Sequence, residues 1–397
     1  MFLCDWHWVG GPVTFLRRAC ASLTSVAWSP EILLVPSLWP CTFDLTDQTI
    51  PTQTISYSYN WSELGRRLGD AIYTTNPDVV VGFANRGAPL AMRHLYRRGK
   101  FTGHYLDLIQ SDIPSEYARV RSNSDFASAV GAVSEGCVQR ARREIPELEG
   151  RVYRVYYPVP CPSTPPAKKD AGEGPIRLAY LGIVRHHEKR ALDFIPLVSE
   201  LLARKVDFEL TIIGDGSERQ QLQRALFAMP GAAPRVRFLG MLANPEALEV
   251  LSHQHVLLLV SEVEGQPIAM LEAMALGVVP VVSDLAGLRE IIVAGENGFL
   301  APFGATTEFA CKIDHLARSP EVRSKMALAA WKTVFANHKM KTAIGKFAET
   351  LETVCGLPLP DRRRLAPDTY PGNAMNRYRI PHYIQGLKRR LMKQVVF

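Results

Sequence analysis

Short, unbroken apolar runs recur along the chain, and many are followed by a longer segment in which apolar residues return at helical spacing. A run that is apolar at every position predicts a strand buried on both faces, as in a parallel sheet. Strands that alternate with helices in this way predict strand-helix-strand units. The pattern therefore predicts an α/β fold built on doubly wound parallel sheets.

The clearest unit lies at residues 255–284, with the sequence HVLLLVSEVEGQPIAMLEAMALGVVPVVSD. Residues 256–260 and 278–282 predict buried strands, because both runs are apolar throughout. Residues 270–276 are nearly all strong helix formers, and Pro267 suits the first helical position, where its missing N–H has no partner to lose. The segment therefore predicts a strand, a loop, a helix and a second parallel strand.

The loop of this unit carries the candidate chemistry, because ligands of open α/β sheets bind where a strand ends and a helix begins. Gly265 allows a ligand to approach the backbone, and the free N–H groups at the helix start favour a phosphate. Glu264 precedes the helix and Glu272 lies within it, so we expect two carboxylates to flank one ligand. The loop and helix start consist of Glu264, Gly265, Gln266, Pro267, Ile268 and Ala269.

Glu264 and Glu272, with seven residues between them in EGQPIAMLEAMALGVVPVVSD, resemble the signature of the retaining GT-B glycosyltransferases, in particular glycosyltransferase family 4. In that family the first Glu contacts the donor sugar and the second contacts the ribose of the nucleotide. The resemblance implies a GT-B fold, in which two Rossmann-like domains face a cleft. It also implies transfer of a hexosyl group from a UDP- or GDP-linked sugar to an acceptor hydroxyl. The alternative is that both glutamates are solvated charges.

A basic loop follows the strand predicted at residues 176–181. Family 4 enzymes carry a Gly-Arg pair and a Lys six residues after that Gly, and the two cations grip the donor diphosphate. Here Ile183 follows Gly182, and the Lys comes seven residues after the Gly. One residue is therefore inserted, and the resemblance assigns the two roles to Arg185 and Lys189. A solvated basic turn is the alternative.

Three further loops resemble parts of the family's donor site. Gly10 and Gly11, after a strand predicted at residues 1–4, resemble the loop that faces the donor across the cleft, although a plain tight turn is the alternative. Gly214 and Gly216 resemble the family's IxGxG loop. Residues 236–240 resemble the strand that ends near the nucleobase, so Met241 joins the predicted donor contacts.

Gln110 and Asp112 follow a strand predicted at residues 105–109. Relatives often carry His, close to the transferred sugar, at the position of Gln110, so a His-dependent role is in doubt here. We expect Gln110 to hydrogen-bond a sugar hydroxyl and Asp112 to orient the acceptor. Loop capping by both side chains is an equal alternative.

The pattern divides the chain into two domains. Residues 158–175 hold six prolines without apolar periodicity and predict a linker. It separates an N-terminal, acceptor-side Rossmann-like domain at residues 1–157 from a nucleotide-sugar-binding one at 176–355, and a basic tail at 356–397 follows. Further first-domain strands are predicted at residues 31–36, 54–59, 78–83, 125–134 and 151–158, with helices at 14–23, 62–74, 89–98 and 138–143.

Composition excludes several classes of protein. The chain has 397 residues, 47% of them hydrophobic, which suits two globular cores, and no apolar run is long enough to span a membrane. Asp5 and His7 interrupt the start where a signal peptide needs an apolar segment, and the seven cysteines form no CxxC pair, so we expect a cytoplasmic protein. The sequence contains no DxD motif to bind a metal ion, and Arg185 and Lys189 can neutralise the donor diphosphate. We therefore expect no metal and no other cofactor.

The net charge is concentrated at the end of the chain. Residues 356–397 contain nine Lys or Arg and two Asp, and 9 − 2 = +7 equals the net charge of the whole protein. The rest is neutral, so no nucleic-acid partner is predicted. Ile380, Ile384, Leu387 and Leu391 recur at helical spacing among these cations, which predicts a helix lying on an anionic membrane surface. A terminal helix packed on the body is the equal alternative.

The predicted partners are a nucleotide sugar and a carbohydrate, lipid-linked or small-molecule acceptor, as in polysaccharide or glycolipid biosynthesis. Two other functions remain open. A non-hydrolysing sugar-nucleotide epimerase has the same architecture but needs no acceptor. The chain could also be an inactive binding or scaffold protein, in which Gln110 and the shifted Lys189 mark the loss of catalytic residues.

Overall fold

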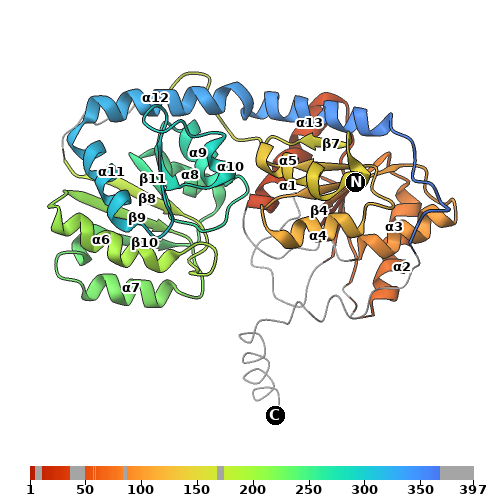
Figure 1. Cartoon of the computed structure of the whole chain (residues 1–397), viewed down its shortest axis with the longest axis horizontal. Coiled ribbons are helices and arrows are strands. Elements are labelled where there is room, and N and C mark those ends of the chain that lie inside the picture. The colour runs from red at the N-terminus through yellow and green to blue at the C-terminus, as the bar shows by residue number, and fades with distance from the viewer. Residues whose placement is uncertain are drawn as a thin grey trace, which may run out of the picture.

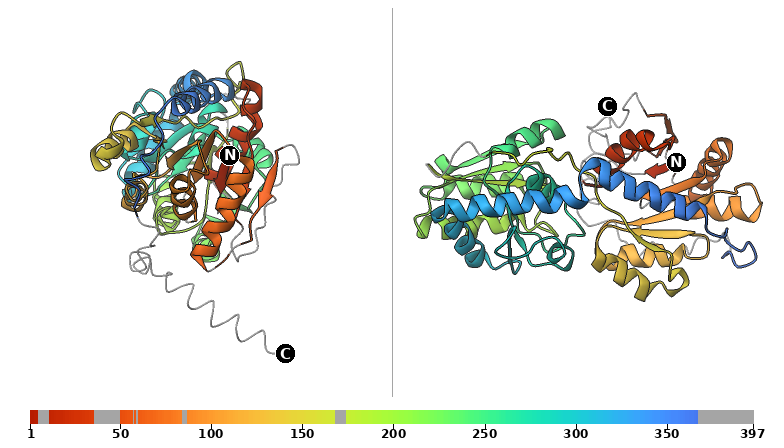
Figure 2. Two further views of the ribbon diagram at one scale, coloured as in Figure 1. Left: turned by 90° about the vertical axis from the view of Figure 1, so that its right-hand side faces the viewer. Right: turned by 90° about the horizontal axis from the view of Figure 1, so that it is seen from above.

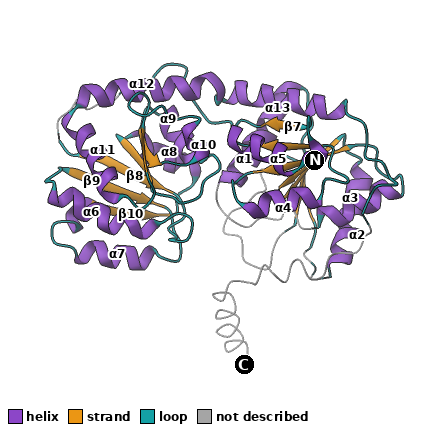
Figure 3. Cartoon of the chain, viewed as in Figure 1, coloured by secondary structure: helices purple, strands orange, loops and turns teal. Residues whose placement is uncertain are grey.

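The computed structural model describes residues 1–4, 11–35, 50–56, 58, 60–83, 87–167 and 174–366. These residues form two domains that lie side by side, each with a central sheet between layers of helices (Figures 1 and 3). Both sheets are wholly parallel among the strands described. The predicted pair of doubly wound α/β domains is confirmed.

The first sheet has the strand order β3-β2-β1-β4-β5-β6-β7. β5 is buried along its whole length, including its two polar residues His104 and Asp107. Asn60 and Ser134 cap α2 and α5 by accepting hydrogen bonds from the first backbone N–H groups of each helix. The elements are β1 (Phe2–Cys4), α1 (Gly11–Leu23), β2 (Ile32–Leu34), β3 (Thr52–Thr54), α2 (Trp61–Thr75), β4 (Val79–Phe83), α3 (Ala88–Arg97), β5 (His104–Ile109), α4 (Pro114–Ser122), β6 (Ala129–Ala132), α5 (Glu135–Glu144) and β7 (Val152–Arg154).

The second sheet has the order β10-β9-β8-β11-β12-β13, and its central strands β11 and β12 are fully buried. Its strands are β8 (Ile176–Leu181), β9 (Phe208–Ile213), β10 (Val236–Gly240), β11 (Val256–Leu259), β12 (Val279–Ser283) and β13 (Phe299–Ala301). Its helices are α6 (Phe194–Ala203), α7 (Arg219–Ala228), α8 (Asn244–Ser252), α9 (Ile268–Ala275), α10 (Ala286–Arg289), α11 (Thr306–Arg318) and α12 (Pro320–Asn337). The last helix of the described chain is α13 (Met340–Cys355).

Several elements differ from their predictions. Only Ala129–Ala132 of the strand predicted at 125–134 is extended, because Phe126 and Ala127 donate to the carbonyl of Asn123 in a turn. The helix α4 was not predicted, since it buries only Tyr117 and Val120 and so lacks a clear apolar stripe. Pro267 caps α9 instead of occupying its first helical position.

The helix α13 packs on the first domain, although it lies within the range 176–355 predicted for the second. Figure 2 shows α12 and α13 running end to end across both domains. Phe347 of α13 packs edge-on against Phe15 of α1, with ring centroids 5.6 Å apart, and also contacts Phe2 of β1. The apolar face of α13 is thus buried under the first sheet, and burial of this kind is worth roughly 1.5–3 kcal/mol for each large side chain.

Among the described residues the chain crosses between the domains twice, and the two crossings lie together. Val159 donates its N–H to the carbonyl of His338 at 2.8 Å, and the His338 ring nitrogen Nδ1 donates to the carbonyl of Tyr157 at 3.0 Å. Trp331 of α12 donates to the carbonyl of Pro162 at 3.1 Å. The start of the predicted linker is therefore fixed against the junction of α12 and α13.

The predicted tail helix at 380–397 lies outside the described residues. The described part of the tail ends on the first domain, where Arg97 donates to the carbonyl of Leu365 at 3.1 Å and the N–H of Ala366 donates to Asp125 at 2.8 Å. Within the described ranges, no helix has the length and apolar character needed to cross a membrane. The six described cysteines are free thiols.

His338 predicts a pH dependence of the free energy of unfolding. Burial lowers its pKa from 6.5 to about 4, so the folded protein stays unprotonated at this ring while the unfolded chain takes up a proton. The free energy of unfolding should therefore fall as the pH drops from about 6.5 to about 4, by a total of roughly 3 kcal/mol. Urea unfolding of the protein and of His338→Asn, measured from pH 7.5 to 4.5, tests this.

The variant should show a flatter pH profile, because its amide keeps a donor for Tyr157 but does not titrate. His253→Asn is the matched control, since the side chain of His253 is 55% exposed. An equal slope in the wild type and in His338→Asn would contradict the assignment.

Candidate active site

The predicted site residues gather at the carboxyl ends of the parallel strands. In the second sheet, the loops after β8, β9, β10, β11 and β12 follow one another along this edge, because these strands are neighbours. The strand order reverses between β8 and β11, and ligands of such sheets bind at that switch point. Arg185 and Lys189 follow β8, and the loop from Glu264 to Pro267 follows β11.

Lys189 and Glu264 meet at this switch point. The Lys189 ammonium donates to Oε1 of Glu264 at 2.7 Å, and the hydroxyl of Ser261 donates to the same oxygen at 2.7 Å. The Glu264 side chain is 9% exposed and that of Lys189 is 25% exposed. Two residues that the sequence assigned to one ligand, 75 positions apart, are therefore in direct contact.

The other cations of the β8 loop have different partners. Arg185 donates to Glu188 at 2.6 Å and is 36% exposed. Arg190 pairs with Asp193 at 2.7 Å and lies over the ring of Phe303. Lys189 is thus the cation paired with Glu264, while Arg190 pairs with Asp193 and, at 3.4 Å, with Glu262 of the loop after β11.

Two glycines bring the β9 loop against the β8 loop. A Cβ atom at Gly214 would lie 1.9 Å from the carbonyl oxygen of Gly182, and one at Gly216 would lie 2.2 Å from that of Val184. Gly214 also has φ of 134°, which L side chains rarely adopt. Any larger residue would separate the two loops, so these predicted donor-site glycines are required for the packing itself. Met241, after β10, is 47% exposed.

The N-termini of α9 and α1 converge across the domain boundary. Gly11 is the first residue of α1, and a Cβ atom there would lie 3.6 Å from Cδ1 of Ile268, the first residue of α9. In the described part of the chain, no acceptor bonds the N–H groups of Ile268 and Ala269. Free N–H groups at the start of α9 favour an anion there. Gly10 lies outside the described residues.

Glu272 is buried and paired with the first domain. Its side chain is 4% exposed, and its Oε1 atom accepts hydrogen bonds from Arg18 of α1 and from Asn244 of α8, the latter at 3.0 Å. The surface-charge alternative for Glu272 is wrong, because the side chain is enclosed. Sequence reasoning missed both Arg18 and Asn244. The nearest signal was the predicted position of α1 after the Gly-Gly loop.

The β11 loop and the end of β5 touch through their backbones. A Cβ atom at Gly265 would lie 2.4 Å from the carbonyl oxygen of Gln110, and one at Gly287 would lie 2.0 Å from the carbonyl oxygen of Gly265. Gln266 is 4% exposed, and neither atom of its amide has a partner; the amide nitrogen of Gln110 also has none among the described residues. Native proteins rarely leave buried amides unpaired, so these two groups are available to a ligand.

Asp112 and Glu290 form two further contacts. Tyr117 and Arg140 donate to Oδ1 of Asp112 at 2.8 and 2.9 Å, so this carboxylate holds α4 and α5 to the end of β5. Glu290 of the second domain accepts from the N–H groups of Glu135 and Gly136, at 2.7 and 2.6 Å, and thereby caps α5 of the first domain. The sequence did not predict this cap.

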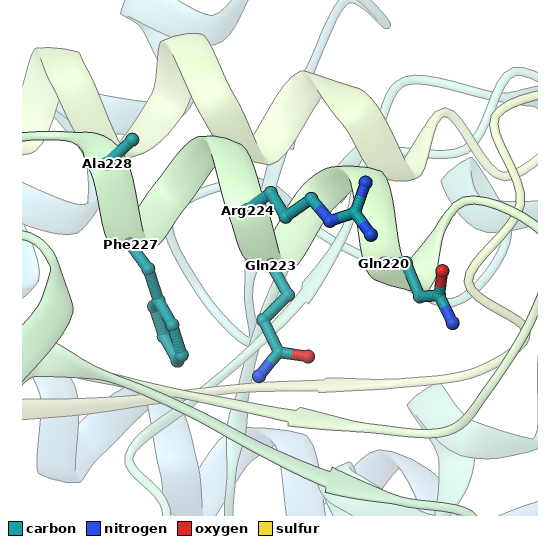
Figure 4. Close-up of a pocket in the computed structure, with 5 residues that line it drawn as sticks. All are labelled: Gln220, Gln223, Arg224, Phe227 and Ala228. Carbon is teal, nitrogen blue, oxygen red and sulfur yellow. The ribbon is translucent and has the colours of Figure 1, made fainter.

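A separate shallow groove lies on the outer face of α7, with a volume of about 560 Å³. Figure 4 shows its lining side chains, which come from this one helix. They are Gln220, Gln223, Arg224, Phe227 and Ala228, and none of them is a candidate site residue.

Residues 175–319 match the family model described as Glycosyl transferases group 1. The chain is 28% identical over 159 residues to N-acetyl-alpha-D-glucosaminyl L-malate synthase of Bacillus anthracis, across 40% of this chain and 41% of that protein. It is 33% identical over 170 residues to lipopolysaccharide 1,6-galactosyltransferase of Salmonella typhimurium, across 41% of this chain and 45% of that protein. The chain thus spans less than half the length of these curated relatives. The matches support a glycosyltransferase.

Solved structures resemble most of the chain. Anabaena Alr3699/HepE in complex with UDP-glucose superposes with a TM-score of 0.72 at 16% identity, across 89% of this chain and 98% of that one. The lipopolysaccharide outer core galactosyltransferase WaaB, in its apo form, gives a TM-score of 0.68 at 20% identity, also across 89% and 98%. The GT-B architecture predicted from the sequence is confirmed.

The approach of Gly265 to Gln110 predicts that even a methyl group there is destabilising. In Gly265→Ala the new Cβ meets backbone atoms, which cannot rotate away, so the domains must move apart locally. The variant should lose roughly 1–3 kcal/mol in its free energy of unfolding. Hydrogen exchange should increase in residues 264–268 and 110–112, as measured by mass spectrometry.

Gly345→Ala is the matched control, because nothing lies within 4 Å of a Cβ atom at that position of α13. It should be neutral or up to about 1 kcal/mol more stable, since Ala has the higher helix propensity. Unchanged exchange at both loops in Gly265→Ala would show that the contact is not maintained in solution.

Proposed function

We propose that the protein is a glycosyltransferase that moves a hexosyl group from a UDP- or GDP-linked sugar to an acceptor hydroxyl, with retention at the anomeric carbon. The contact between Lys189 and Glu264 at the switch point carries the proposal. It places a cation and a carboxylate beside the start of α9, with Glu272 further along the same helix. The cation can bind a diphosphate, and the carboxylates can accept hydrogen bonds from sugar hydroxyls.

In this reaction the bond between the anomeric carbon and the diphosphate oxygen breaks, and its electron pair stays on the diphosphate. Lys189, Arg185 and the free N–H groups of Ile268 and Ala269 stabilise that growing charge. The acceptor oxygen then bonds to the anomeric carbon, and its proton leaves to the diphosphate or to water. These groups supply positive charge without a metal ion, and we include none in the proposal.

The sugar lies between the two domains in this proposal. Glu264, the unpaired amide of Gln266 and the unpaired amide nitrogen of Gln110 offer acceptors and donors to its hydroxyl groups. Gln110 then replaces the His found in relatives as a neutral hydrogen-bonding group. The named relatives and HepE, which was solved with UDP-glucose, support a nucleotide-sugar donor and a carbohydrate acceptor.

The first experiment is a thermal-shift screen with UDP- and GDP-sugars, followed by turnover assays with the stabilising donor and a panel of sugar and lipid-linked acceptors. A ligand at a hundred times its dissociation constant should add roughly 2.7 kcal/mol to the free energy of unfolding. Nuclear magnetic resonance of the product gives its anomeric configuration. An epimer formed from donor alone would replace the proposal with the epimerase alternative.

Removal of Lys189 should lower the turnover number more than it raises the Michaelis constant, because its interaction strengthens as the diphosphate leaves. We expect Lys189→Ala to lose roughly a hundredfold in kcat, and Arg185→Ala to act in the same direction. Steady-state kinetics with the identified donor measure both.

Arg190→Ala is the informative comparison, because the Arg190 side chain is paired with Asp193 and should affect stability more than turnover. Arg204→Ala, at the C-cap of α6, is the control for removal of a cation elsewhere in the second domain. A larger loss of kcat in Arg190→Ala than in Lys189→Ala would show that the insertion is placed wrongly.

We also propose that the tail attaches the protein to an anionic membrane surface, where a lipid-linked acceptor would lie. The described part of the tail ends at Ala366 on the first domain, and Arg363 and Arg364 just before it are exposed. Each Lys or Arg near an anionic leaflet is worth about 1 kcal/mol. Deletion of residues 380–397 should abolish co-sedimentation with phosphatidylserine vesicles, while turnover of a soluble acceptor persists.

High salt should release the full chain from the same vesicles, because the attraction is electrostatic. Unfolding or loss of donor binding in the shortened chain would instead assign the tail a structural role.

A further inference from the structure

Arg18 bonds to both domains and to the linker, although no sequence motif pointed to it. From α1 of the first domain, its Nη2 atom donates to Oε1 of Glu272 and, at 3.0 Å, to the side-chain oxygen of Asn244, both in the second domain. Its Nη1 atom donates to the carbonyl of Pro158, at the start of the linker, at 3.2 Å. One guanidinium therefore joins both domains and the segment between them.

The geometry leaves one oxygen of Glu272 for a ligand. Arg18 and Asn244 both donate to Oε1, while Oε2 accepts no hydrogen bond from the described residues. The rotation of the carboxylate is fixed by these two donors, because a planar guanidinium and an amide restrict the directions from which they bond. A ligand hydroxyl can therefore reach Oε2 without displacing either partner.

We infer that Arg18 is a positioning residue that orients Glu272 toward the ribose diol of the nucleotide and so determines selectivity for ribonucleotides. The inference rests on the proposed function, in which Glu272 contacts the ribose. Arg18 does not itself touch the reacting atoms. It acts through Glu272, whose buried charge it pairs, and its place on α1 makes this orientation dependent on the contact between the domains.

Competition is the opposite possibility, in which Arg18 occupies the carboxylate until the nucleotide displaces it. Positioning is favoured because Arg18 and Asn244 also bond one another, and both lie on the same oxygen. The side chain of Arg18 is only 10% exposed and has three acceptors, so displacement would leave a buried guanidinium with fewer partners.

The experiment compares Arg18→Met with Arg17→Met. Both residues lie on α1, but Arg17 is exposed, so the second variant controls for removal of a positive charge from this helix. Each protein is titrated calorimetrically with UDP, GDP and ADP, and then with the 2′-deoxy form of the nucleoside diphosphate that binds the wild type most tightly. Arg18→Lys, Glu272→Ala and the double variant Arg18→Met with Glu272→Ala complete the set.

The wild type and Arg17→Met should bind the ribonucleotide about tenfold or more tightly than its 2′-deoxy form, the ratio expected for one hydrogen bond to a charged group. Arg18→Met should weaken ribonucleotide binding by about tenfold and lose most of that preference, while binding of the deoxy form changes less. Arg18→Lys should recover part of the preference, since Lys is a point charge without the planar fork. The double variant should bind no more weakly than Glu272→Ala alone.

A merely structural role for Arg18 would weaken both nucleotides equally and leave their ratio unchanged, and that result would overturn the inference. So would tighter binding by Arg18→Met, which would establish competition. Additive losses in the double variant would likewise show that Arg18 does not act through Glu272. If the wild type binds none of the three nucleotides, the proposed function fails and this inference fails with it. If the wild type binds a nucleotide and Arg18→Met binds it equally well with the same preference, only this inference fails.

Discussion

The close backbone approach between Gly265 and Gln110 is the constraint on which the candidate site depends. The end of β5 in the first domain and the loop after β11 in the second meet where a Cβ atom has no room, and Gly287 packs on the other side of the same loop. Three backbone segments are thereby stacked in direct contact. Everything proposed for this site, from the unpaired amides to the Glu272 pair, requires the two domains to meet at this separation.

Two carboxylates also require the domains to stay in contact, because their partners lie on the opposite domain. Glu272 is enclosed and has its cation on the opposite domain, and Glu290 finds its main donors at the N-terminus of α5, also on the opposite domain. When the domains part, both carboxylates regain water; when they close, the desolvation cost is offset only if Arg18 and α5 are in place. The pairs therefore favour one relative position of the two domains. A shift of a few ångströms between the domains would leave both carboxylates without these partners.

The second domain could be predicted in detail because its signals are local. Buried strands, the glycines at 214 and 265, and the spacing of Glu264 and Glu272 all lie within short stretches, and each has a direct geometric meaning. The contacts that complete the site join residues far apart in the chain. Arg18 and Glu272 are 254 positions apart, and Glu290 and Glu135 are 155 apart, and nothing in the neighbouring residues of either pair indicates the other. The packing of α13 on the first domain likewise depends on distant residues, because Phe347 meets Phe15 and Phe2 near the start of the chain.

The β8 loop holds Lys189 between two residues with an uncommon backbone conformation. Glu188 and Arg190 both adopt the left-handed backbone conformation, with φ of 68° and 51°, which is uncommon for residues other than glycine. The carbonyl of Glu188 accepts from the N–H of Glu262, and Arg190 is held by Asp193, so tertiary contacts support both turns. Lys189 lies between them, and the two reversals aim its side chain at Glu264. Backbone strain of this kind persists only where the surroundings fix it, and here it accompanies the contact between Lys189 and Glu264.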